Sequence, residues 1–269
     1  MPEGPEVRLT VDFLSKKLQG NIITNWMFCG GRYADNFPEF YQTFDSNLPM
    51  YVKSVKCKGK FIYFILQNSS GKEFYILHSL MLTGRWQNVH DDYCKWYVEY
   101  KDGDKTYTIW FRDVRSFATI EFTDNIDVLK TKLTNLGPDI LSRDFTLDVF
   151  IKQISNKPLT NICSFLMDQS NISGCGNYIK AEVLYESNIS PLRKVESLTE
   201  DEIESLYNSL RIISRLSYNN KGVSLKDYTN ENGDKGYYHI KLKVYGNKDM
   251  KTTKTADGRT TYWDPKTQK

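Results

Sequence analysis

Residues 168–178 read Asp168-Gln169-Ser170-Asn171-Ile172-Ser173-Gly174-Cys175-Gly176-Asn177-Tyr178, and this stretch decides how the second half of the chain folds. Its two glycines, Gly174 and Gly176, permit a sharp backbone turn directly before a helix that begins at Asn177. Backbone N–H groups at the start of such a helix, with the Asn177 amide beside them, can bind a phosphate. Judged without the rest of the chain, an ordinary glycine-rich turn between two helices is the better interpretation.

Helical periodicity surrounds this turn. Apolar residues recur at helical spacing in four segments, 147–155, 159–168, 177–187 and 200–219. Thr199 and Glu202 form a capping box at the start of the last segment. We therefore expect a helical domain, with the turn of residues 168–178 between its second and third helices.

The first half of the chain has a different pattern. Residues 5–20 are predicted to form a helix, because Pro5 suits a first helical turn and Gly20 suits a stop. Short β-type segments then follow at 21–28, 52–66, 73–89, 96–100, 106–111 and 118–122, with hairpin loops at 69–72 and 101–104. Many short strands in succession favour an antiparallel sandwich or barrel.

These patterns predict an α+β multidomain protein. Its parts are an N-terminal antiparallel β-sandwich with a leading helix (1–133), a helical domain (134–229), and a small basic β-hairpin region (230–269). The chain has 269 residues, of which 40% are hydrophobic and 14% aromatic, so disorder throughout is excluded. No apolar run approaches the ~20 residues of a membrane span, and the N-terminus lacks a signal-peptide pattern. We expect a nuclear or cytoplasmic protein.

The charge distribution indicates which class of partner the chain could bind, and the cysteines indicate which kinds of cross-link or metal site it could contain. The net charge is +3, but residues 235–269 carry nine Lys or Arg against three Asp, interleaved with aromatic residues. Such a segment favours a polyanion partner, although a solvated basic tail explains the charge equally well. The five cysteines are scattered and none follows Cys175, which argues against a disulfide framework and against a compact zinc site.

The N-terminus, Met1-Pro2-Glu3-Gly4-Pro5-Glu6, carries the most specific chemistry. Removal of Met1 would leave the secondary amine of Pro2 free. A free α-amino group has a reference pKa of about 8, against about 10.4 for lysine, so far more of it is unprotonated and nucleophilic at neutral pH. This amine can attack a sugar C1′ to form an iminium ion, with Glu3 and Glu6 supplying proton transfers. A frayed terminus with two prolines is the alternative for the motif alone.

The chain resembles the formamidopyrimidine-DNA glycosylase/endonuclease VIII (Fpg/Nei) family of bifunctional DNA repair glycosylases along its whole length. Six motifs carry this resemblance, and they occur in the same order as in the family. They are Pro2-Glu3-Gly4-Pro5-Glu6-Val7-Arg8, Lys58-Gly59-Lys60-Phe61, Leu136-Gly137-Pro138, the stretch 168–178, Ser224-Leu225-Lys226-Asp227-Tyr228 and Lys243-Val244-Tyr245-Gly246. The pair Gly4 and Arg8 is similar to the endonuclease VIII branch. The abundance of Lys, Asn and Tyr indicates an AT-rich source genome, such as that of a large DNA virus.

The resemblance implies a role for particular residues. It assigns catalysis to Pro2, Glu3, Glu6 and Lys60, with Lys60 reaching the phosphate beside the lesion, and it makes Asn177 a phosphate contact. When the damaged nucleotide flips out, the gap is filled by Leu82 (Met81 is the competing residue), by Arg115 opposite the orphaned base and by Phe117 stacked beside it. On pattern alone, Leu82 is more often a core residue and Arg115 a partner of Asp113.

The chain departs from many relatives at its C-terminal end. Those relatives have a four-cysteine zinc finger, whereas residues 255–263 resemble the zincless-finger subgroup, so no zinc and no other cofactor is expected. Arg259 would contact DNA from a type I′ turn at Asp257-Gly258. Packing of Tyr245, Tyr262 and Trp263 would offset the missing metal. His78, His90 and His239 are expected to be structural or surface residues.

The implied function is a DNA glycosylase with AP lyase activity that removes oxidised bases, mostly pyrimidines. It would act through a Schiff base at Pro2 and β,δ-elimination. The implied partner is damaged DNA, duplex or single-stranded, bound by a monomer. Two alternatives stay open: a DNA-binding relative without catalysis, and a protein that binds RNA through its helix-two-turn-helix motif.

Overall fold

The computed structural model describes residues 1–223 and 237–269. The motif at Ser224–Tyr228 and the predicted boundary between 229 and 230 lie outside the described residues. The chain divides into two compact units. The first contains Met1, Pro2, residues 6–134 and Val223, and the second contains Glu3–Pro5, residues 135–222 and Tyr237–Lys269.

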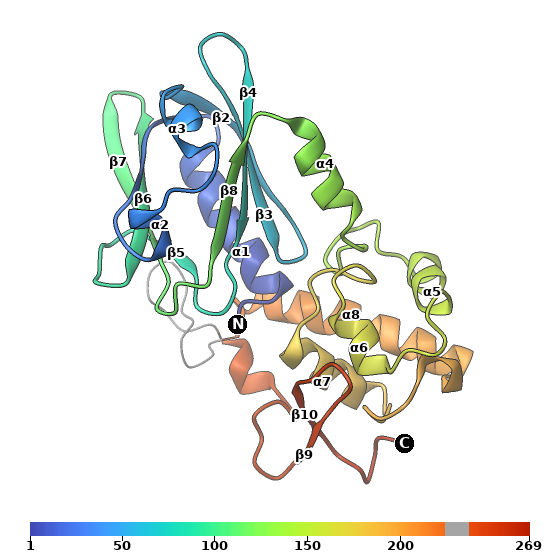
Figure 1. Cartoon of the computed structure of the whole chain (residues 1–269). Coiled ribbons are helices and arrows are strands. Elements are labelled where there is room, and N and C mark those ends of the chain that lie inside the picture. The colour runs from blue at the N-terminus through green and yellow to red at the C-terminus, as the bar shows by residue number, and fades with distance from the viewer. Residues whose placement is uncertain (224–236) are drawn as a thin grey trace. The chain divides into compact units, whose positions relative to one another are not determined.

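The first unit is built on one antiparallel sheet that follows helix α1 (Gly4–Leu18) (Figure 1). Its strand order is β5-β7-β6-β1-β2-β3-β4-β8. The strands are β1 (Ile22–Phe28), β2 (Met50–Lys58), β3 (Phe61–Gln67), β4 (Glu73–Ser79), β5 (Arg85–Gln87), β6 (Cys94–Asp102), β7 (Lys105–Arg112) and β8 (Thr119–Thr123). The predicted antiparallel β domain with a leading helix is confirmed.

The sheet folds over so that its two ends enclose one aromatic core. Trp26 of β1, fully buried, makes edge contacts with Phe64 of β3, Trp86 of β5 and Phe122 of β8, with ring centroids 5.8–5.9 Å apart. Edge-to-face pairs of this kind add stability beyond the burial of their area. Helix α1 joins this core through the apolar face that its sequence predicts, namely Val7, Val11, Leu14 and Leu18.

Several element boundaries differ from those predicted. The segment 52–66 is a hairpin rather than one strand, because Gly59 turns the chain with φ +57°. The segment 73–89 is likewise interrupted, by the loop 80–84 between β4 and β5. Three short helices, α2 (Arg32–Asp35), α3 (Tyr41–Asp45) and α4 (Ile126–Thr134), were not predicted. Helices α2 and α3, of four and five residues, are too short for a helical period to stand out in the sequence, and α4 buries only Leu129, so it has no apolar stripe to recognise.

The second unit holds the helices and a two-stranded sheet. Its elements are α5 (Leu147–Ser155), α6 (Ile162–Met167), α7 (Asn177–Glu186), η1 (Val195–Ser197), α8 (Glu200–Asn219), η2 (Tyr238–Lys241), β9 (Lys251–Lys254) and β10 (Thr260–Trp263). The predicted helices are confirmed, although α6 begins three residues later than expected because the Asn161 side chain caps it. The predicted capping box of Thr199 and Glu202 is present. Within the described ranges, no helix has the length and apolar character needed to cross a membrane.

Helix α7 lies at the centre of the second unit. Its residues Tyr178–Leu184 are all buried, including the charged Lys180 and Glu182. The Glu182 carboxylate accepts three backbone N–H groups, from Lys243 (2.9 Å), Val244 (3.0 Å) and Tyr245 (2.7 Å). One buried carboxylate therefore fixes the Lys243-Val244-Tyr245-Gly246 motif against α7, because three charge-assisted hydrogen bonds compensate its burial.

The single buried histidine of the described core, His78 on β4, is a structural residue, as expected. Its Nδ1 lies 2.8 Å from the carbonyl oxygen of Thr119 on β8, and its Nε2 accepts a hydrogen bond from the indole N–H of Trp86 at 3.3 Å. Both contacts fit the neutral ring with its proton on Nδ1. Burial lowers the pKa of His78 from 6.5 to about 4.

We expect the first unit to lose stability as the pH falls from 6.5 towards 4, because the unfolded chain then binds a proton at His78 that the folded chain does not. The lowered pKa corresponds to about 3 kcal/mol of unfolding free energy. Urea unfolding across this pH range measures the effect. The variant His78→Gln has no titrating ring and should lose less stability, so equal losses in both proteins would contradict the prediction.

Candidate functional site

Glu3 is fixed at the start of helix α7. Its side chain is 2% exposed, and its two carboxylate oxygens accept the backbone N–H groups of Tyr178 (2.9 Å) and Ile179 (3.2 Å). These N–H groups belong to the first helical turn, where no intrahelical partner exists and the helix dipole favours a negative charge. A residue next to the chain terminus is therefore held in one position by a segment about 175 residues away in sequence.

The glycines of the signature make room for this contact. A Cβ atom at Gly176 would lie 2.2 Å from the Glu3 carboxyl carbon, so only glycine fits there. The N–H of Gly4 donates to the carbonyl oxygen of Gly174 at 2.9 Å, and Gly174 has φ +103°, a conformation that other residues rarely adopt. The Gly-x-Gly pattern thus serves the docking of the N-terminal residues.

This arrangement corrects one expectation. The sequence predicted that backbone N–H groups at the start of α7 bind a phosphate. The N–H groups of Tyr178 and Ile179 are instead bonded to Glu3. Glu3 occupies the position because its carboxylate is the anion that the helix start accepts.

Pro2 and Glu6 belong to the first unit. Pro2 is buried, and Glu6, in the first turn of α1, is 1% exposed. An oxygen of the Glu6 carboxylate accepts the backbone N–H of Val223 at 2.8 Å. Glu6 is therefore a buried carboxylate with a defined orientation, which is what a proton-transfer group requires.

Asn177 contacts the C-terminal hairpin. Its amide nitrogen donates to the carbonyl oxygen of Thr260 on β10 at 3.1 Å. The amide has two hydrogens, so this bond uses one of them. This bond joins Asn177, the predicted phosphate contact, directly to the hairpin that carries Arg259. The Arg259 side chain is exposed.

The hairpin turn differs from the predicted type I′ turn. The loop between β9 and β10 spans residues 255–259, and the N–H of Gly258 donates to the carbonyl oxygen of Thr255 at 2.9 Å. Gly258 has φ +76°, whereas Asp257 is not left-handed, as a type I′ turn would require. The physical reason is that the Asp257 side chain turns inward, accepts a hydrogen bond from Thr255 and is only 4% exposed.

Asp257 forms a buried ion pair with Lys180 of α7. The Lys180 Nζ lies 2.6 Å from a carboxylate oxygen of Asp257, and the Lys180 side chain is fully buried. Burial opposes ionisation of Asp257, but the hydrogen bonds from Lys180 and Thr255 outweigh it and lower the pKa of this carboxyl. The pair joins the hairpin loop to the central helix of the unit.

Aromatic packing supports the same hairpin, as expected. Tyr245 contacts Tyr262 edge-on with centroids 5.5 Å apart, and Trp263 is 5% exposed with its indole N–H bonded to the Thr253 hydroxyl at 2.9 Å. The groups that point inward around the loop are Thr255, Thr261 and the Lys180–Asp257 pair. A structural zinc needs four thiolate or imidazole ligands, so this set of side chains does not fit the metal.

Breaking the ion pair should destabilise the second unit strongly. In Lys180→Met the Asp257 carboxylate stays buried without its cation, which costs about 3–5 kcal/mol. The matched control is Lys130→Met, because Lys130 forms an exposed pair with Asp127 whose side chains are 66% and 76% accessible. That control should change stability by less than about 1 kcal/mol. Urea unfolding measures the loss of unfolding free energy in both variants. Similar small losses in the two would show that the Lys180–Asp257 pair contributes little to the stability of the second unit.

The residues predicted to contact DNA in the first unit lie on turns between strands. Lys60 follows Gly59 in the turn between β2 and β3 and is half-buried. In the loop 80–84, Met81 is 45% exposed with φ +54°, whereas Leu82 is half-buried. The second loop, 113–118, carries Arg115 and Phe117, both exposed. Exposure thus favours Met81 over Leu82 as the residue that could enter a base stack.

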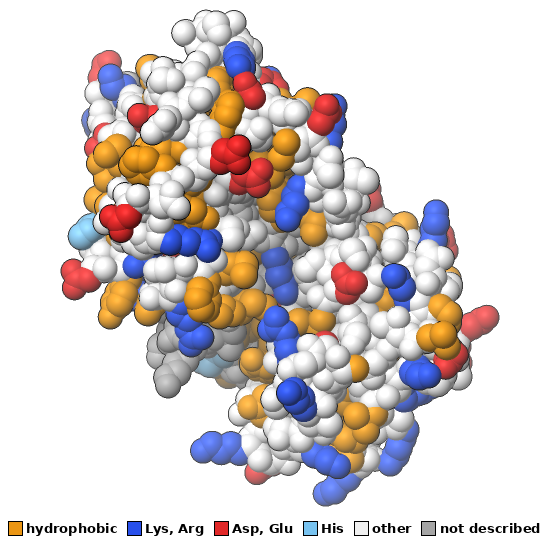
Figure 2. Space-filling model, viewed as in Figure 1, with side chains coloured by type: hydrophobic (Ala, Val, Ile, Leu, Met, Phe, Trp, Pro, Cys, Tyr) orange, Lys and Arg blue, Asp and Glu red, His pale blue; other side chains and the backbone are white. Residues whose placement is uncertain are grey.

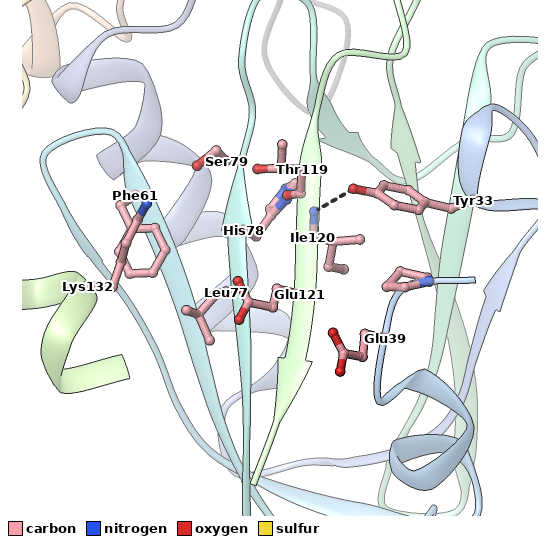
Figure 3. A pocket seen from close by; sticks show the side chains of 11 residues that line it. Tyr33, Glu39, Phe61, Leu77, His78, Ser79, Thr119, Ile120, Glu121 and Lys132 are labelled. Atoms are coloured by element: carbon pink, nitrogen blue, oxygen red, sulfur yellow. Dashed lines mark hydrogen bonds between the residues drawn. The ribbon is translucent and has the colours of Figure 1, made fainter. Parts of the chain in front are cut away.

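The first unit also has an open cavity of about 390 Å³ (Figure 3). Its lining includes Leu77 of β4, Glu121 of β8, Lys132 of α4 and the side chains of Tyr33 and Glu39. None of the nine predicted site residues, all of which are described, contributes to this lining. Two carboxylates at its walls would repel phosphate, so we do not assign DNA contact to it.

Exposed basic residues gather on the C-terminal hairpin. Figure 2 shows Lys and Arg side chains on the face that carries β9 and β10, with few acidic ones among them. The exposed Lys and Arg residues of the hairpin and of the segment directly before it include Lys248, Lys251, Lys254 and Arg259. Such a patch provides the electrostatic, sequence-independent attraction that nucleic-acid backbones need.

Comparisons with known proteins agree with these features. Residues 1–120 match the formamidopyrimidine-DNA glycosylase N-terminal domain, and residues 136–228 match the formamidopyrimidine-DNA glycosylase H2TH domain. The formamidopyrimidine-DNA glycosylase of Prochlorococcus marinus is 27% identical, with 100% of both chains covered. That of Listeria monocytogenes is 29% identical, covering 93% of this chain and 89% of the relative.

Solved structures show the same fold. MutM in complex with DNA containing carbocyclic 8-oxo-G superposes with a TM-score of 0.84 at 23% identity, over 100% of both chains. A Lactococcus lactis FPG mutant in complex with Fapy-dG-containing DNA gives a TM-score of 0.85 at 24% identity, again over 100% of both chains. This chain therefore has the fold of those proteins.

Proposed function

Because this chain belongs to the Fpg/Nei family of DNA glycosylases, we propose that it excises oxidised bases from damaged DNA and then cleaves the abasic strand. The observation that carries the proposal is the fixed position of Glu3. A frayed terminus would leave Glu3 in solvent, whereas both of its carboxylate oxygens are bonded at the start of α7. The residue directly after Pro2 is therefore held as a catalytic group requires.

In the proposed reaction the Pro2 secondary amine attacks C1′ of the damaged nucleotide. The C1′–base bond breaks, and the base leaves with the bonding electrons and takes up a proton, assisted by Glu3. The Pro2 nitrogen, now bonded to C1′, loses its proton and opens the sugar ring: the C1′–O4′ bond breaks and O4′ takes up a proton. The resulting iminium ion acidifies the C2′ proton, so β-elimination releases the 3′ phosphate and δ-elimination releases the 5′ phosphate. The proton transfers need no metal or organic cofactor.

Binding is assigned to the residues that lie on turns or exposed surfaces. Lys60, Asn177 and Arg259 would contact phosphates, together with the basic hairpin. Phe117, Arg115 and either Met81 or Leu82 would fill the gap that the flipped nucleotide leaves. Because several cations meet phosphates, the affinity for DNA should fall steeply with salt.

Oxidised pyrimidines are the proposed main substrates, since Gly4 and Arg8 resemble the endonuclease VIII branch. Oxidised purines are the second candidate, because solved proteins of this fold are complexed with DNA containing 8-oxo-G or Fapy-dG. The relative rates of excision from otherwise identical duplexes decide between them.

Borohydride trapping on duplex DNA containing 5-hydroxyuracil, and in parallel on DNA containing 8-oxoguanine, tests the proposal. A covalent protein–DNA band that requires both the lesion and the reductant supports it. Tight binding to abasic DNA without any trapped band would instead identify a DNA-binding protein without catalysis. A preference for RNA over damaged DNA would favour the RNA-binding alternative.

A further inference from the structure

Two loops of the first unit present exposed apolar side chains next to left-handed backbone positions. Met81 of the loop 80–84 is 45% exposed and has φ +54°. In the loop 113–118, Val114 is 41% exposed, Phe117 is 50% exposed and Ser116 has φ +54°. Apolar tips held in costly conformations persist only where neighbouring structure fixes them, so the supports of these loops matter.

Asp113 is the support that both loops share. It is completely buried, although it begins an exposed loop. Its carboxylate accepts the Thr83 hydroxyl of the first loop, and within its own loop it accepts the backbone N–H groups of Arg115 (3.2 Å) and Ala118 (2.8 Å). The Thr83 hydroxyl oxygen in turn accepts the Arg115 N–H at 3.2 Å. One carboxylate and one hydroxyl thus connect residues 30 positions apart.

Each loop is also fixed at its far end. In the first, Gly84 donates its N–H to the Leu80 carbonyl oxygen at 3.0 Å, and a Cβ at Gly84 would lie 2.4 Å from that oxygen. In the second, the Arg32 guanidinium donates to the Ala118 carbonyl oxygen at 2.7 Å. The backbone of Ala118 is therefore fixed at its N–H group by Asp113 and at its carbonyl oxygen by Arg32.

We propose that Asp113 and Thr83 are positioning residues that hold the two loops as one rigid wedge, so that the apolar tip of one and the Arg115–Phe117 tip of the other enter duplex DNA together. This inference rests on the proposed function. It does not concern the chemistry at Pro2, and it distinguishes duplex from single-stranded substrates. In duplex DNA, extruding a nucleotide opens a gap and an orphaned base, whereas single-stranded DNA presents neither.

The test compares Thr83→Val, which keeps the shape but removes the hydroxyl, with Thr83→Ser, which keeps the hydroxyl, and with Asp113→Asn. Excision of 5-hydroxyuracil is measured on duplex and on single-stranded DNA, and trapping is measured on a single-stranded abasic site. Asp91→Asn serves as the matched control, because Asp91 is a partly buried carboxylate of the same unit that accepts the Tyr93 N–H at 2.9 Å and the Arg112 guanidinium at 2.7 Å.

Thr83→Val and Asp113→Asn should lower kcat on the duplex roughly tenfold or more, because small misplacements of positioning groups are costly. Both should act normally on single strands, and Thr83→Ser and Asp91→Asn should resemble the wild type on both substrates. Equal losses on duplex and single strands, unchanged duplex activity, or failure of both variants to fold would overturn the wedge proposal. Absence of trapping by the wild type would instead refute the proposed function on which it rests.

Discussion

A form of the chain with one additional residue ahead of Pro2 should give no covalent product with abasic DNA after borohydride reduction. The extra residue converts the Pro2 nitrogen into an amide, which has no nucleophilic lone pair and cannot form an iminium ion. The loss should be nearly complete, because the new terminal α-amine lies one residue away from the position that the Glu3 contacts fix.

The measurement is the fraction of abasic DNA trapped, with the N-terminus of each preparation established by mass spectrometry. Binding to an abasic analogue that lacks the aldehyde is the control, because the extended chain should still bind it if its fold is intact. Pro2→Gly retains a terminal amine of similar basicity, so some trapping should remain. Full trapping by the extended form would show that another nucleophile forms the adduct.

Local signals in the sequence predicted much of the fold. The bounds of α5 and α8 coincide with those predicted, because a capping residue begins each helix and an apolar stripe runs along it. The hairpin at Gly59-Lys60 was missed because one glycine interrupts a continuous run of β-forming residues. The type I′ turn was wrong because Asp257 makes a long-range contact with Lys180, and turn propensity does not report such a partner.

For the candidate site, too, the sequence predicted single residues but not the contacts between distant segments. The sequence identified Glu3 and the Gly174–Asn177 turn as separate features, but it could not show that the Glu3 carboxylate binds the helix start after that turn. Neither the Lys180–Asp257 pair nor the contact between Asp113 and Thr83 was predicted. Lys180 lies between buried Ile179 and Ala181, and a charged residue inside such an apolar run is a signal of a buried ion pair. Asp113 offers no comparable signal, because loop aspartates are common.

Replacing Glu3 by glutamine should lower base excision by about 10²–10⁴-fold, the usual contribution of a positioned proton-transfer group. The side chain keeps its size but loses the carboxylate that assists departure of the base. Trapping on a pre-formed abasic site should fall much less, because the open sugar already offers an aldehyde to the Pro2 amine and no base has to leave. The ratio of the two activities is therefore the quantity to measure.

Glu3 has a structural role as well, and a matched variant separates the two. In Glu3→Gln one of the N–H groups of Tyr178 and Ile179 loses its acceptor, at a cost of about 1–3 kcal/mol. Glu182→Gln makes the same change at another 2%-exposed carboxylate of the same unit, one that also accepts backbone N–H groups. If excision per folded molecule falls equally in both, Glu3 acts only as a helix cap. A loss confined to Glu3→Gln places the carboxylate in the reaction, because Glu182→Gln also takes an acceptor from buried backbone N–H groups but at a residue far from Pro2 in sequence.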